Sequence, residues 1–172
     1  WGTRQPEPYF DASEKLYHVA LAKDTRSPFR EDDELASEKE GEETEEKSSK
    51  KKKNKKDNEN DEDAVNVKID ISGIQQRIIE VPVKPGNYSW LEVSDKAIYV
   101  RSTDTGIGAK NHLSVIKIDN KDVKTTKMVS EINGFELTND GEKILVNKNK
   151  TYYMIDAGTS KVSDLSKHKI DL

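Results

Sequence analysis

The feature that most restricts the fold is a repeated pattern of two short apolar strands joined by a polar loop. The stretch "GEKILVNKNKTYYMID" (residues 141–156) follows the same plan as "DKAIYVRSTDTGIGAKNHLSVIKID" (residues 95–119), which lies about 46 residues earlier. The aligned pairs are Ile98 with Ile144, Tyr99 with Leu145, and Val100 with Val146, and the second strand of each copy closes on an aspartate, Asp119 or Asp156. A repeat of this length is typical of propellers and solenoids.

A third, weaker copy opens the chain. "DASEKLYHVALA" (residues 11–22) places Leu16 and Tyr17 after a similar acidic turn, and its second strand is expected to end at Asp70. Runs rich in Ile, Val, Tyr and Thr, bounded by turn residues, predict strands over residues 65–70, 77–81, 88–93, 97–101, 113–119, 125–132, 135–137, 143–147 and 152–156. No segment has a sustained helical period, so the chain is predicted to be all-β.

The spacing of these strands is that of a propeller blade, which has four short antiparallel strands in about 40 to 46 residues. We therefore predict an all-β fold, a partial β-propeller of the WD40 or TolB-like kind. It would contain two to three four-stranded antiparallel blades, from residues 1–29 and 65–172. Because a closed ring takes roughly four to eight blades, we expect further blades outside this sequence.

Between these parts, residues 30–64 contain 15 acidic and 9 basic residues, no aromatic residue and only Leu35, Ala36 and Ala64 to bury. Such a segment cannot offset its ordering entropy by burial, and we expect a disordered charged insertion. Its net charge of −6 leaves +2 for the rest of a chain whose total is −4. The lysine run at residues 50–56 is flanked by acidic blocks, so no nucleic-acid partner is predicted.

Motif searches nominate no catalytic, cofactor-binding or metal-binding residue. "TGIGAKN" (residues 105–111) lacks the third glycine of a dinucleotide site and the ending of a P-loop, and it is interpreted as a hairpin loop. His18 is expected to be a packed, hydrogen-bonded strand residue, and His112 and His168 are expected in surface loops. The chain has no cysteine and no apolar run of membrane-spanning length.

One stretch carries a more specific resemblance, "VKIDISGIQQRIIEVPVKPGNYSWLEVSDKAIYV" (residues 67–100). It resembles the second propeller of the tricorn protease family, large serine peptidases of the C-terminal-processing clan. "YHVALAKDTRSPF" (residues 17–29) is similar to the preceding strand and loop of that propeller, after which homologues often carry a charged insert. "DGEKILVNKNKTYYMIDAG" (residues 140–158) resembles its last blade.

The resemblance implies a non-catalytic propeller segment that forms a channel wall and gates peptide access to a protease core. The parent would be a serine endopeptidase whose catalytic residues lie beyond this sequence, so this chain is not expected to be an enzyme. Its partners would be the other blades and protease domains of the parent and peptides in transit, with a homo-oligomer left open. The implied location is cytoplasmic, or alternatively periplasmic. A different class, a stand-alone TolB-like propeller that acts as a protein-binding scaffold, also stays open.

Overall fold

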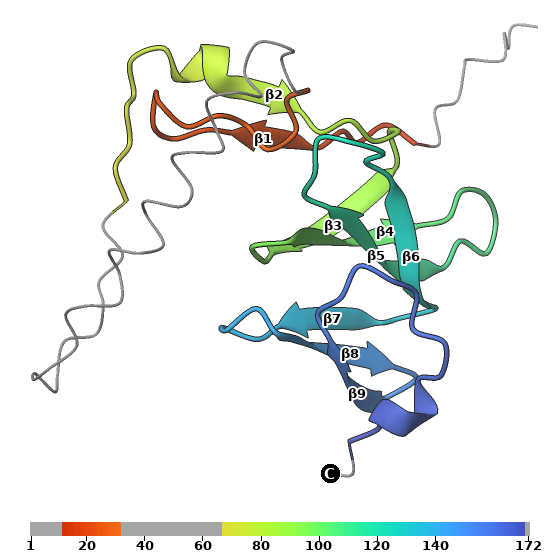
Figure 1. Cartoon of the computed structure of the whole chain (residues 1–172). Helices are drawn as coiled ribbons and strands as arrows, with labels where there is room; N and C mark the ends of the chain where they lie inside the picture. Colours follow the sequence, from red (N-terminus) through yellow and green to blue (C-terminus); the bar gives the residue numbers. More distant parts are fainter. Residues whose placement is uncertain (1–11, 32–66, 171–172) are drawn as a thin grey trace, which may run out of the picture.

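In a computed structural model, residues 12–31 and 67–170 are described, and within them the chain forms β-strands and two short 3-10 turns without an α-helix (Figure 1). The strands make three antiparallel sheets of two, four and three strands, none of which closes on itself. The prediction of an all-β chain is confirmed. Residues 32–66, which contain most of the expected insertion, lie outside the described ranges.

The sheets follow one another along the chain. The first pairs β1 (Tyr17–Val19) with β2 (Ile78–Glu80), which follows η1 (Ile74–Arg77). The second has the order β3 (Asn87–Val93), β4 (Ala97–Thr103), β5 (Asn111–Lys117), β6 (Thr125–Ser130). The third has the order β7 (Gly134–Leu137), β8 (Lys143–Lys148), β9 (Thr151–Asp156), and η2 (Ser166–His168) comes after it. No helix in the described ranges has the length and apolarity to traverse a bilayer.

Turn chemistry explains why neighbouring strands form hairpins. Between β8 and β9, Lys148 pairs with Thr151, and the two residues between them, Asn149 and Lys150, have φ of 51° and 62°. Two successive left-handed residues are the mark of a type I′ turn, whose twist matches that of the flanking strands. The expected turn at residues 147–150 is confirmed at its tip, although Asn147 and Lys148 belong to β8.

Two apolar cores hold the three sheets together. Ile98 and Val100 of β4 belong to the core that also contains Val81 and Phe29, beside the first sheet. The alternate residues Ala97 and Tyr99 point to the opposite face, because side chains alternate along a strand. They share a second core with the third sheet, whose buried members include Ile144, Val146 and Ile155. The four-stranded sheet is therefore the middle layer, as Figure 1 shows.

The predicted repeat corresponds to matching strands. β4 and β8 are each the second strand of their sheet, and Ile98 with Val100 occupies the same face, toward the preceding sheet, as Ile144 with Val146. β9 ends at Asp156 as predicted, whereas β5 ends at Lys117, two residues before Asp119. Asp156 pairs with Lys143, whose repeat counterpart is Ala97, and Ala97 pairs with Lys117 rather than Asp119. A slip of two residues preserves the face of every side chain, which is why the pattern conceals it.

The prediction of a strand at residues 65–70 is wrong for residues 67–70, the part that the structure describes. Residues 67–70 form no strand, and Val67, Ile69 and Ile71 are exposed. Instead the N–H of Asp70 donates to the carbonyl of Leu21. The other predicted strands are confirmed, with boundaries that move by at most two residues.

The side chain of Arg77 holds this segment in place, although the segment has no strand-to-strand hydrogen bonds. Its guanidinium donates to the carbonyls of Ala20 (2.8 Å), Ser72 (3.1 Å), Leu21 (3.3 Å) and Asp70. One side chain thereby satisfies backbone oxygens from both sides of the point where the chain leaves for residues 32–66. These hydrogen bonds, all between described residues, hold residues 20–21 next to residues 70–77.

The two edges of the sheets differ. On the β6 and β9 side, the segment after β9 covers the edges, because Val162 donates its N–H to Met128 and Ile170 donates its N–H to Tyr152. On the other side, β3 and β7 are edge strands of their sheets and lie next to each other. Exposed backbone and side chains therefore collect along β3 and β7.

Candidate binding surface

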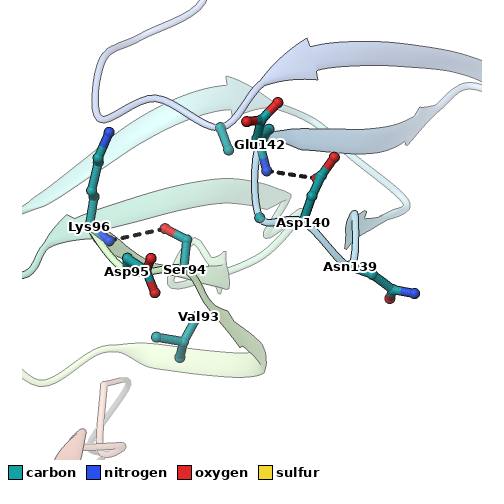
Figure 2. Close-up of a pocket in the computed structure, with 9 residues that line it drawn as sticks. Val93, Ser94, Asp95, Lys96, Asn139, Asp140 and Glu142 are labelled. Atoms are coloured by element: carbon teal, nitrogen blue, oxygen red, sulfur yellow. Dashed lines mark hydrogen bonds between the residues drawn. The ribbon is translucent and has the colours of Figure 1, made fainter. Parts of the chain in front are cut away.

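A hollow near this open side lies between two hairpin turns of adjacent sheets. It has a volume of about 440 Å³, and Figure 2 shows the turn after β3 facing the turn before β8. The polar residues that line it are Ser94, Asp95, Lys96, Asn139, Asp140 and Glu142. Val93 and Ala157 add a small apolar part.

Each turn is held by a short polar side chain. Ser94 Oγ accepts the N–H groups of Lys96 (3.3 Å) and Ala97 (3.2 Å), and Asp140 accepts the N–H of Glu142 (3.0 Å). Gly141 has φ of 70°, and a Cβ there would lie 3.5 Å from that of Ser94. The gap between the two turns is therefore just wide enough for one Cβ atom at position 141.

Three carboxylates, those of Asp95, Asp140 and Glu142, set the charge of this hollow. The hydroxyl of Thr138 and the N–H of Glu142 hold the pKa of Asp140 below its ordinary value of 3.8, so this carboxylate stays charged at neutral pH. Within the described ranges, no group of three or more His, Cys, Asp or Glu side chains is placed to hold a metal ion. The turn residues are committed to backbone hydrogen bonds, as short polar residues commonly are in turns.

Next to the hollow is a second feature, which we call the β3–β7 seam and define by Trp90, Glu92 and Leu137. The indole Nε1–H of Trp90 donates to Glu92 Oε1 at 2.9 Å. The other carboxylate oxygen of Glu92 accepts the N–H of Leu137 in β7. Glu92 thus joins the edge strands of two sheets and orients the indole, while Trp90 is 61% exposed.

The histidines do not come together. His18 lies in β1, and its ring meets Phe29 edge-on with centroids 6.0 Å apart, as expected for a packed strand residue. The expected hydrogen bond is not formed at Nδ1, which is buried without a partner among the described residues. The prediction for His112 is wrong, since it lies in β5 and is buried. Its Nε2 is 2.7 Å from Asp104 Oδ2, and its Nδ1 accepts the N–H of Glu131. Both ring nitrogens are engaged, so this imidazole holds a loop in place. His168 lies in η2 and is half-buried.

The glycine stretch at residues 105–111 forms the connection between β4 and β5, as predicted. Gly106 and Gly108 have φ of 88° and 80°, conformations that side chains rarely adopt. Between them Ile107 is fully exposed. No phosphate-binding arrangement is formed, because strand β5 rather than a helix follows the loop.

Sequence reasoning did not find the β3–β7 seam, although a signal was present. In "NYSWLEV" the large apolar residues fall at positions 88 and 90 and then at 91 and 93, so the alternation changes phase. The structure has a register shift between Ser89 and Leu91 at that point. Such a break in a strand is typical of a β-bulge, which turns one side chain away from its expected face.

Comparisons of the chain with protein-family models, with curated proteins and with solved structures found no match.

Proposed function

We propose that this chain is a non-catalytic part of a β-propeller, whose stacked sheets form a wall with a binding edge. The observation that carries the proposal is the way consecutive sheets pack. Ile98 and Val100 on the second strand of one sheet, and Ile144 and Val146 on the second strand of the next, each face the preceding sheet. A stack with one repeated interface has two end faces, which further sheets of the same kind would cover.

The end faces support this proposal. On the third sheet, Leu145 and Met154 form a cross-strand pair on the face opposite Ile144, and they line a shallow hollow with Glu136. At the other end, Tyr17, Val19 and Ile78 of the first sheet are exposed. Contiguous apolar side chains on an outer sheet face usually mark an interaction surface.

The resemblance to the tricorn protease family makes the proposal more specific. The wall would restrict the access of peptides to a protease core elsewhere in a cytoplasmic parent enzyme. The family's insert-bearing loop would correspond to the charged segment at residues 30–64. The alternative, a stand-alone scaffold propeller, uses the same open faces for a protein partner.

The test of the stacking proposal is the association state of the full chain in sedimentation velocity. We expect concentration-dependent association through the open faces, and Leu145→Asp should weaken it without unfolding the chain. A chain that stays strictly monomeric and folds cooperatively would overturn the propeller proposal. Such behaviour would mean that the three sheets fold stably without further sheets packed on their outer faces.

Two further measurements test the protease wall, and the second separates it from the scaffold. The chain should not hydrolyse fluorogenic peptides, and turnover that survives replacement of every serine by alanine would contradict the wall proposal. Sequencing the parent gene past Leu172 tests it directly. A PDZ-like region followed by a serine flanked by glycine supports the wall, whereas an immediate stop codon supports the scaffold.

A further inference from the structure

The backbone at Trp90 is in a conformation that needs an explanation. Its φ is 47°, in the left-handed region, and it is the extra residue at the register shift between Ser89 and Leu91. A bulky side chain rarely adopts this region, and residues held there commonly sit at functional sites. The bulge turns Trp90 out of the alternation of β3, so the indole is presented rather than packed.

The indole is also fixed in orientation. Nε1–H is bonded to Glu92 Oε1, and Glu92 is held in turn by the N–H of Leu137. Two successive hydrogen bonds therefore position an indole that is exposed to solvent. Among the residues that the structure describes, no aromatic ring or cationic group is found stacked on the indole.

The exposure of Trp90 has a different origin from that of its apolar neighbours. Leu91 and Val93 pair with Val100 and Ile98, so they share the face that looks toward the first sheet. Both are exposed, and within the described residues the first sheet contains two strands. Glu92 pairs with Tyr99 on the opposite face, and its bond to Trp90 places the indole at the β3–β7 seam. Further strands on the first sheet would therefore cover Leu91 and Val93 rather than the seam.

The chemistry of the seam selects a cation. The face of an indole carries negative electrostatic potential and attracts ammonium and guanidinium groups more strongly than other aromatic rings do. Donation of Nε1–H to a carboxylate moves further electron density into the ring, and the charge of Glu92 adds to the attraction. The neighbouring hollow is lined by three carboxylates, of Asp95, Asp140 and Glu142, and by one cation, Lys96. Its net charge is therefore negative, like that of the seam.

We propose that Trp90 binds the lysine or arginine side chain of an extended polypeptide that lies along the β3–β7 seam. A polypeptide fits because β3 is an edge strand, with backbone groups that an extended chain can pair with. The inference deepens the proposed role as a wall along which peptides pass, and it rests on that role for its biological meaning. Its geometry rests on Trp90, Glu92 and Leu137 alone.

The experiment uses the full chain with Trp1→Phe, which leaves Trp90 as the single tryptophan. The probe is a short peptide with arginine between two leucines, and the matched control is the same peptide with citrulline, which keeps the shape but has no charge. We expect saturable quenching or a spectral shift of Trp90 fluorescence with the arginine peptide. The citrulline peptide should bind about two- to fivefold more weakly, the size of one cation–π contact at an exposed ring.

Two substitutions connect this binding to the indole. Trp90→Asn removes the ring and is compatible with a left-handed backbone, so the fold should persist and peptide binding, followed by the anisotropy of a labelled peptide, should be lost. Leu91→Asn, on the other face of β3, should leave binding unchanged. Equal affinity for the arginine and citrulline peptides, or unchanged binding by a folded Trp90→Asn chain, would overturn the inference.

The failure of this inference is distinguishable from the failure of the proposed function. Peptide binding by a chain that is strictly monomeric would retain the Trp90 site and reject the stacked wall. Association through the sheet faces without selectivity for arginine would do the reverse.

Discussion

The packing of Ile144 allows the repeat to be tested by a single substitution. Ile144 has no exposed surface and belongs to the core between the second and third sheets. Ile144→Asp removes an apolar side chain whose truncation alone costs about 2–5 kcal/mol. It also forces a carboxylate either to lose its hydration or to take up a proton in an apolar site. We expect the free energy of unfolding to fall by more than about 4 kcal/mol, which is a large part of the roughly 5–15 kcal/mol of an ordinary domain.

Urea denaturation, followed by far-UV circular dichroism and tryptophan fluorescence, measures this change. Two matched variants give the scale. Ile144→Val should cost only about 0.5–1.5 kcal/mol, and Leu145→Asp, on the open face of the same strand, should cost much less than Ile144→Asp. A loss of less than about 1 kcal/mol for Ile144→Asp would refute the reasoning, because typical substitutions anywhere in a protein reach that value. An equal loss at Leu145 would show that the outer face is also buried.

Three further outcomes are expected. Replacing residues 31–63 by a short Gly/Ser linker should leave the free energy of unfolding within about 1 kcal/mol of the full chain, since this stretch has almost nothing to bury, and urea denaturation checks it. Arg77→Met should lower the free energy of unfolding by roughly 2–3 kcal/mol in the same assay, because the partly buried carbonyls of Ala20 and Asp70 lose a charged donor, and Arg77→Lys should restore little of it. The pKa of Asp104 is held below its ordinary 3.8 by hydrogen bonds from Lys127 and then His112. Its stabilising contribution is therefore complete above that value and is lost as the pH falls below about 4, so Asp104→Asn should flatten the acid side of a plot of urea midpoint against pH.

Much of the fold could be predicted from local sequence patterns. Alternating apolar residues and turn chemistry located the strands from β2 to β9, and Asn149 with Lys150 formed the expected hairpin turn. The period of the repeat identified Ile98 and Ile144 as matching positions, because both must be buried on the face toward the preceding sheet. Such features depend on residues that are close in sequence, so they can be predicted from one sequence alone.

Features set by distant partners were not accessible in the same way. Residues 67–70 alternate like a strand, but Arg77 satisfies the nearby carbonyls and no strand forms. His112 appeared to be a loop residue because its burial depends on Asp104 and Glu131, which contribute a carboxylate and a backbone N–H from other segments. The site at Trp90 depends on Leu137 of another sheet, and only the break in alternation at Ser89 and Trp90 pointed to it.

The closure around Arg77 also has a consequence for protein engineering. The chain departs after Glu31 and returns at Val67, while the hydrogen bonds that fix the corner come from Ala20, Leu21 and Asp70. A position whose two ends are secured independently of what lies between them is suited to accept a foreign domain. A fluorescent protein or an affinity module could be grafted there as a reporter, on a different sheet from Trp90.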